Sequence, residues 1–164
     1  MTQRMLFGAL AGLSATMAMT AAMRRLFPRL DRADRYPLPP REITETLLPP
    51  DQRGIATATV LAHFGYGAAA GAVFGLFPRR NGSGALYGAA VWSASYLGWI
   101  PAMHILKPAT SHPSGRNLLM ITAHLVWGTA LDIGLRELDR SAQDIFAPGA
   151  LKDRQRNGSR SSDQ

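Results

Sequence analysis

The sequence predicts an all-α membrane protein, a bundle of four transmembrane helices, from the positions and the lengths of its uncharged stretches. Just over half of the 164 residues lie in four stretches without Asp, Glu, Lys or Arg, at residues 5–23, 54–78, 81–106 and 117–131. The 18 basic and 11 acidic residues all lie outside these stretches, although the mean hydropathy of −0.04 is that of an ordinary soluble protein. A soluble domain scatters its charges, because each amphipathic helix keeps one face in water. Apolar stretches of about 20 residues are what a bilayer requires.

The first span is expected at residues 5–23, and a cleaved signal peptide is the alternative. Arg4 precedes this stretch, and residues 19–22 are small enough for cleavage. The stretch is longer than the apolar core of a signal peptide, which has about 7–15 residues. Arg24 and Arg25 follow it directly, as in a membrane stop. We therefore expect a retained helix.

A polar connection rich in Arg and Pro follows at residues 24–53. The prolines of residues 36–40 predict a non-helical segment, because proline lacks the backbone donor and restricts the residue before it. Residues 41–48 predict two helical turns that end at Pro49 and Pro50, with Ile43, Leu47 and Leu48 on one face. This short helix either packs on the end of the bundle or lies at the lipid headgroups; the alternative is a recognition or gating segment.

The remaining spans are expected at residues 55–77, 84–106 and 117–135. Pro101 should kink or end the third helix. The fourth helix should continue into water through residues 136–140. The four-helix domain then covers residues 1–146, and the polar tail 147–164 has too little apolar surface to fold alone.

Two pairs of short matches relate the first two spans to the last two. The pattern A-H-x-x-aromatic-G occurs at residues 62–67 and again at 123–128, and G-A-L-x-G occurs at residues 8–12 and 84–88. One interpretation is a tandem duplication of a helical hairpin, with the halves related by a pseudo-twofold axis along the membrane normal. Coincidence in a chain with 16 glycines is the other.

Small residues recur at four-residue spacing, which places them on one face of each helix. Glycines on such a face let a second backbone approach closely, as helix association in lipid requires. The predicted packing residues are Gly8, Gly12, Gly67, Gly71, Gly75, Gly84, Gly88 and Gly128.

Three polar residues within the spans are the candidate intramembrane site: His63, His124 and Asp132. Polar groups at this depth are costly and mark a functional hypothesis by default. The structural alternative is that each neutral imidazole hydrogen-bonds a neighbouring helix, with Thr16, Thr20, Ser93 and Ser95 as candidate partners. The functional alternatives are a path for protons or small solutes lined by all three residues, and a b-type haem held by the two histidines.

Other chemistries find little support in the sequence. Asp132 lies two turns, about 12 Å, from His124, so these residues lack the ligands of a metal site. The absence of cysteine excludes disulfides, thiolate clusters and covalently attached c-type haem. No nucleophile elbow, phosphate-binding loop or dinucleotide motif is present, so no catalytic residue is assigned and an enzyme is not expected. His104 and His112 are expected near the membrane interface.

The net charge of +7 favours contact with anionic lipid headgroups and not with nucleic acid, because the basic residues flank apolar spans. With four spans, nine basic residues fall on each side, so the positive-inside rule does not orient the chain. Asp132 and Arg136 are spaced to form an ion pair where the last helix leaves the membrane.

Four segments, residues 8–20, 39–44, 63–67 and 124–128, resemble the YagU-like group of bacterial inner-membrane proteins, and the resemblance covers roughly residues 5–135. It implies a multi-pass inner-membrane protein of uncharacterised activity and supplies no catalytic residue. We expect a non-enzymatic structural or accessory membrane subunit, without a cofactor, associated with copies of itself or with other membrane proteins. The alternatives are a small transporter or proton-conducting pore and, third, a haem-binding protein.

Overall fold

The computed structural model describes residues 1–48, 54–78 and 83–147, and this part of the chain is helical without any strand. The four longer helices and the short helix of the connection are α1 (Thr2–Leu26), α2 (Pro39–Leu47), α3 (Ile55–Phe74), α4 (Ser83–Ser93) and α6 (Ser114–Asp144). A π-helix, η3 (Ala94–Trp99), and one turn, α5 (Ile100–Ala102), follow α4 directly, with a kink at Gly98. Single 3₁₀ turns are η1 (Phe27–Arg29), η2 (Arg32–Asp34) and η4 (Ala109–Ser111). The all-α prediction is confirmed.

Two helical segments are long and apolar enough to cross a membrane, Thr2–Arg29 and Ser114–Asp144. They contain the first and the fourth predicted span. The other two spans stay predictions, as does the polar tail, which lies outside the described residues from 148 onward. The predicted helix stop at Pro49 and Pro50 also lies outside them.

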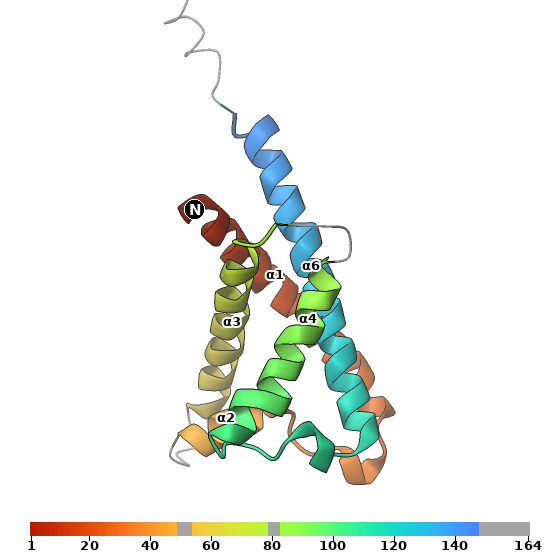
Figure 1. Cartoon of the computed structure of the whole chain (residues 1–164). Coiled ribbons are helices and arrows are strands. Elements are labelled where there is room, and N and C mark those ends of the chain that lie inside the picture. Colours follow the sequence, from red (N-terminus) through yellow and green to blue (C-terminus); the bar gives the residue numbers. More distant parts are fainter. Residues whose placement is uncertain (49–53, 79–82, 148–164) are drawn as a thin grey trace, which may run out of the picture.

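The helices form a bundle with α1 and α6 at its centre. Figure 1 shows α3 (olive) beside α1 and α4 (green) beside α6, and the contacts of α1 with α3, of α1 with α6 and of α4 with α6 are the most extensive. The N-terminus and the C-terminal end of α6 lie at one end of the bundle, and α2 lies at the other (Figure 1). The helices α1 and α4 run in one direction and α3 and α6 in the other, which is the relation that two repeated hairpins would have.

Glycines bring α1 and α3 together at the backbone. A Cβ atom built on Gly71 would collide with the carbonyl oxygen of Gly8 and would lie 2.8 Å from the Cα of Gly12. A Cβ on Gly67 would collide with the hydroxyl of Thr16, and one on Gly75 with the carbonyl oxygen of Arg4. Any side chain at these positions of α3 would therefore push the helices apart.

The second hairpin, α4 with α6, is packed in the same way. A Cβ on Gly84 would collide with the carbonyl oxygen of Gly128 and would lie 2.5 Å from the Cβ of Asp132. A Cβ on Gly88 would collide with the carbonyl oxygen of His124 and would lie 3.3 Å from the Cα of Gly128. Glycine contacts thus hold both hairpins.

The two hairpins differ in register by one helical turn. Gly12 faces Gly67 in the first hairpin, whereas Gly88 faces His124 in the second. The sequence match pairs Gly67 with Gly128 instead. The corresponding face of α6 carries His124, Gly128 and Asp132, and its contacts with α4 are made by the backbone oxygens of His124 and Gly128.

The third predicted span is shorter and less regular than expected. The helix widens into a π-turn at residues 94–99, Gly98 leaves helical geometry (φ −109°, ψ −106°), and the helix ends at Ala102 and not at residue 106. Pro101 explains both features, because its ring clashes with the carbonyl group four residues earlier and it donates no hydrogen bond. His104, just beyond the end, has a left-handed backbone (φ 57°).

Three other helix boundaries can be compared with the predicted ones. Helix α3 ends at Phe74, three residues before the predicted end. Pro39 and Pro40, expected to be non-helical, form the first turn of α2, where backbone N–H groups have no helical partner and proline is tolerated. Helix α6 continues past residue 135 to Asp144, as predicted for residues 136–140.

We expect Gly71→Ala to lower the free energy of unfolding in detergent by about 1–3 kcal/mol, because the added methyl group overpacks the contact between α1 and α3. The matched control is Gly65→Ala in the same helix, since a Cβ at Gly65 meets nothing within 4 Å. The control should be neutral or stabilising by up to about 1 kcal/mol, because alanine favours helix. Equal destabilisation of both variants in thermal unfolding would contradict the packing of α1 against α3.

Candidate functional site

The two histidines of the candidate site line one cavity. This cavity has a volume of about 230 Å³ and lies among α1, α3, the helix from α4 into η3, and α6. His63 reaches it from α3 and His124 from α6. Pro39, Pro40 and Ile43 of α2 line it as well, so the short helix of the connection closes one end.

His63 is tied to α1 through Thr20, one of its predicted partners. The His63 Nε2 atom lies 3.4 Å from the Thr20 hydroxyl, and that hydroxyl donates to the Thr16 carbonyl at 2.8 Å. Since the hydroxyl proton is used on the carbonyl, the imidazole Nε2 is the donor to the hydroxyl oxygen. The Nδ1 of a neutral His63 is then the acceptor of the ring.

His124 bonds within its own helix and not to a neighbouring one. Its Nδ1 lies 2.8 Å from the Met120 carbonyl oxygen. A carbonyl only accepts, so Nδ1 carries the proton and Nε2 of a neutral His124 is an acceptor. Each neutral imidazole thus donates its one N–H to a protein oxygen, and its other ring nitrogen is left as a hydrogen-bond acceptor.

Thr16, another predicted partner, binds a tryptophan and not a histidine. Its side chain is fully buried, its hydroxyl donates to the Gly12 carbonyl at 2.8 Å, and it accepts from Trp127 Nε1 at 3.2 Å. The hydrogen bond from Trp127 to Thr16 connects α6 to α1 at the wall of the cavity.

The cavity reaches the surface of the bundle between α3 and η3. Tyr66 and Trp99 line it and are 46% and 40% exposed. The Tyr66 hydroxyl lies 2.9 Å from the Ser95 hydroxyl, and Trp99 Nε1 donates to the same oxygen at 3.3 Å. Ser95, a predicted histidine partner, therefore joins two aromatic side chains at the mouth.

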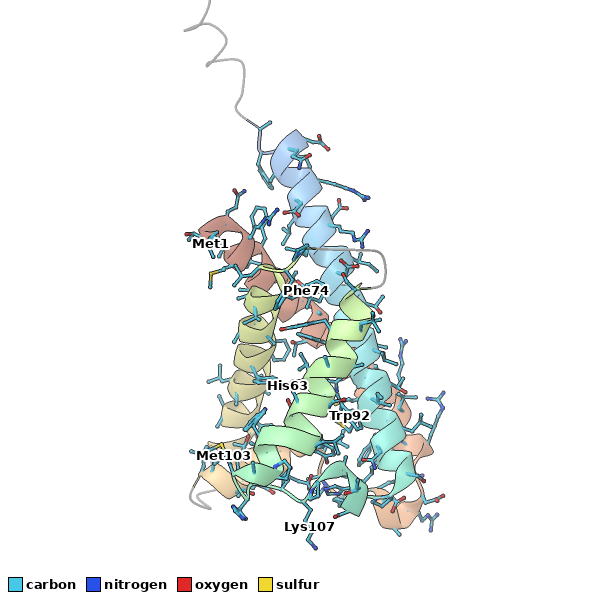
Figure 2. All side chains as sticks on the ribbon, viewed as in Figure 1. Met1, His63, Phe74, Trp92, Met103 and Lys107 are labelled. Atoms are coloured by element: carbon cyan, nitrogen blue, oxygen red, sulfur yellow. The ribbon has the colours of Figure 1, made fainter. Side chains whose placement is uncertain are left out.

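Trp92 presents an unsatisfied donor. Its indole ring lines the cavity, and its Nε1 atom is buried without a hydrogen-bond partner. Figure 2 shows Trp92 on α4 and His63 on α3 at the middle of the bundle. A buried unpaired donor costs about 1–3 kcal/mol, so it marks a place where a ligand with an acceptor would gain affinity.

Asp132, the third candidate residue, does not line this cavity. It is buried on α6 beside Gly84 and accepts from the guanidinium of Arg136 at 2.8 and 3.1 Å. This is the predicted ion pair, and it raises the pKa of Arg136 through the hydrogen bond and the negative charge of Asp132. The structure brings the two histidines together and separates them from the carboxylate.

Sequence reasoning missed a buried cation at the end of the bundle. Arg116 is 1% exposed, and its guanidinium donates to the carbonyl oxygens of Asp34 (3.2 Å), Tyr36 (2.9 Å) and Pro37 (2.9 Å) and to the Glu42 carboxylate (3.3 Å). Its central carbon lies 3.4 Å from the centre of the Tyr36 ring. The sequence shows an arginine before an apolar span, which is the usual position of an interfacial cation, and so carries no signal of burial.

Two aromatic contacts extend this arginine cluster. The Tyr36 hydroxyl lies 3.1 Å from His112 Nδ1, and the His112 ring stacks on Tyr96 with centroids 5.5 Å apart. Tyr96 also lines the cavity. Arg116 therefore fixes the connection and α2 across the end of the bundle, beside the candidate site.

No group of three or more His, Asp or Glu side chains within the described residues is placed to hold a metal ion. Comparison of the chain with protein-family models, with curated proteins and with solved structures finds no match. The resemblance to the YagU-like proteins therefore stays a prediction.

We expect Arg116→Lys to lower the free energy of unfolding by about 2–4 kcal/mol, because an ammonium group cannot reproduce the planar set of charge-assisted hydrogen bonds. The matched control is Arg140→Lys, whose guanidinium is 73% exposed and pairs with Glu137 at 3.9 Å. The control should change stability by less than about 0.5 kcal/mol. Thermal unfolding in detergent compares the two, and a neutral Arg116→Lys would contradict the role of Arg116 in holding the connection.

Burial raises the pKa of Glu42, and this desolvation outweighs the charge of Arg116, which lowers it. A carboxyl group whose pKa is higher in the folded state contributes stability that is present below the unfolded pKa and lost as pH rises through the folded pKa. The wild-type protein should therefore lose stability as the pH rises from the ordinary carboxyl pKa to the raised pKa of Glu42. We expect Glu42→Gln to remove this loss, measured as the melting temperature against pH. Parallel curves for variant and wild type would contradict it.

Proposed function

We propose that the chain is a four-span protein of a bacterial inner membrane that works by binding and not by catalysis, as a structural or accessory subunit. The single observation that carries the membrane location is the distribution of side chains across the bundle. Inward faces carry glycines, an apolar core and buried polar groups such as Thr16, and all four helices also expose large apolar side chains on their outer faces. These include Leu10 and Met17 of α1, Leu61 and Val73 of α3, Leu86 of α4, and Leu125 and Ile133 of α6.

The lengths of the two inner spans support the proposal. Helix α3 has 20 residues, and α4 continues through η3 and α5 from residue 83 to residue 102. At about 1.5 Å per residue each is close to the 30 Å of a hydrocarbon core. Neither contains a charged residue, so both fit a lipid environment along their whole length.

The cavity supports a binding role. Its lining contains two imidazoles, an unpaired indole donor and several hydroxyl groups, and none of the described residues that line it is Asp, Glu, Lys or Arg. No nucleophile in it is paired with a base. The inner-membrane location and the assembly with copies of itself or with other membrane proteins rest on the resemblance to the YagU-like group.

A proton or solute pore is the second candidate. The meeting of His63 and His124 in one cavity favours it. Two contacts oppose a continuous path: Asp132 pairs with Arg136 outside the cavity, and Pro39 and Pro40 of α2 line the cavity end. Flux in liposomes that is lost in a His63→Ala, His124→Ala double variant would favour the pore over the binding protein. A Soret band that is lost in His63→Ala would favour haem.

The absence of native cysteine permits a direct test with single-cysteine variants and a membrane-impermeant maleimide. Four spans predict that Thr2→Cys, Phe77→Cys and Gln143→Cys react from one side of sealed vesicles, and that Asp31→Cys and Ser111→Cys react from the other side. All five side chains are exposed. Reaction of Phe77→Cys from the same side as Asp31→Cys would show that α3 and α4 do not cross the membrane, and this result or release of the protein by alkaline carbonate would contradict the proposal.

A further inference from the structure

We propose that the cavity binds the ring of a lipid-soluble phenol or quinol, a flat aromatic ring that carries a free hydroxyl group. The inference rests on the proposed membrane location and adds a ligand class to it. Four properties of the cavity carry it: size, aromatic lining, unused hydrogen-bonding groups and access from lipid.

The size of the cavity suits one substituted ring. A protein cavity of about 150 Å³ accepts benzene. The cavity here is larger, about 230 Å³, which leaves room for ring substituents and excludes a bulky polycyclic ligand.

The lining favours a flat ring. Five aromatic side chains surround the space: Tyr66, Trp92, Tyr96, Trp99 and Trp127. Neighbouring pairs are tilted toward each other, Trp92 with Tyr96 and Tyr66 with Trp99, each with centroids 6.3 Å apart. Aromatic rings bind other rings in stacked or edge-on arrangements that add about 0.5–1.5 kcal/mol per pair to simple burial.

The hydrogen-bonding groups of the cavity that have no partner in the protein favour a ligand with a hydroxyl group. Trp92 Nε1 can only donate, and it is buried without a partner. His124 uses its Nδ1 proton on the Met120 carbonyl, so its Nε2 can only accept. A phenolic hydroxyl can both accept and donate a hydrogen bond, so it is able to pair with either kind of protein group. The second imidazole, His63, offers a further acceptor in the same cavity, which suits a ring with two hydroxyls.

Other ligand classes fit less well. A carboxylate or an ammonium group would find no countercharge among the described lining residues, and a buried unpaired charge is costly. A saturated acyl chain would leave the Trp92 donor unsatisfied. A quinone carbonyl would satisfy Trp92 and leave the imidazole acceptor without a donor, so the reduced, hydroxylated ring is the better match.

Access from lipid completes the argument. The cavity reaches the surface at Tyr66 and Trp99, which are exposed on α3 and η3 along the sides of the proposed bundle. The Ser95 hydroxyl that joins these two side chains is the contact that must separate or tilt for a ring to enter. The entrance is uncharged and aromatic, which admits an apolar ring more readily than an ion.

The three tryptophans of the chain, Trp92, Trp99 and Trp127, all line the cavity, so intrinsic fluorescence reports its occupancy. The probe is tert-butylhydroquinone, kept reduced under argon, added to the full chain in lipid nanodiscs. Its dimethyl ether, which has the same ring and no hydroxyl donor, is the control ligand. We expect saturable quenching by the hydroquinone and at least tenfold weaker binding of the ether.

Trp92→Phe keeps an aromatic ring and removes the donor, while the other two tryptophans still report binding. We expect it to weaken hydroquinone binding about 5- to 10-fold, the effect of one hydrogen bond. The control variant is Tyr87→Phe, since Tyr87 lies outside the cavity lining and donates to the Ala70 carbonyl; it should bind the hydroquinone as wild type does.

Non-saturating quenching, or equal binding of the hydroquinone and its ether, overturns the inference. If Trp92→Phe fails to fold by circular dichroism, the comparison of the two ligands on the wild-type protein decides alone. Maleimide labelling of the single-cysteine variants in sealed vesicles, together with carbonate extraction, reports the membrane location independently of any ligand. A failed ligand class and a failed membrane proposal therefore give different results.

Discussion

Contact between glycine backbones is the constraint on which the arrangement of this bundle depends. Where Gly8 meets Gly71 and Gly84 meets Gly128, no Cβ atom fits on either partner. In the proposed lipid environment helices gain little from burying apolar side chains against each other, so close backbone packing is their main attraction. These contacts hold α3 against α1 and α4 against α6, and the cavity lies among these four helices.

The end of that cavity depends on prolines and on one buried cation. Pro101 disrupts the third helix, and the π-turn before it carries Ser95 and Trp99 to the mouth. Pro39 and Pro40 start the short helix that packs beside this segment and lines the same space. Arg116 donates to the carbonyl oxygens of the extended segment before that helix through its two terminal nitrogens, and these bonds offset the cost of burying its charge. The site is therefore a consequence of irregular backbone at one end of an otherwise regular bundle.

Sequence reasoning recovered what depends on local spacing. Uncharged stretches indicated the helices, and four-residue spacing placed the glycines on single faces, as with Gly67 and Gly71. The positions of His63 and His124 within the spans grouped them in one candidate site, and both line one cavity. The sequence could not show that the two histidines face one cavity, because a position along a helix does not determine which neighbouring helix the side chain faces.

What sequence reasoning missed depends on contacts between distant residues. Arg116 looks like any interfacial arginine until Asp34, Tyr36 and Pro37 fold over it. The one-turn slip between the hairpins could not be predicted, because the sequence does not show which residue of one helix faces which residue of the next. Asp132 belongs to the predicted site, but it pairs with Arg136 one turn away and does not line the cavity of the histidines.

Spin-label accessibility can show whether all four helices lie in lipid with their apolar faces outward. Single nitroxides are placed at Met17, Leu61, Leu97 and Leu125, exposed positions on α1, α3, η3 and α6, and their collisions with oxygen and with a water-soluble nickel chelate are compared in reconstituted protein. We expect high oxygen and low nickel accessibility at all four sites. High nickel accessibility at Leu61 or Leu97 would show that α3 or the third span lies in water, and would contradict the four-span bundle.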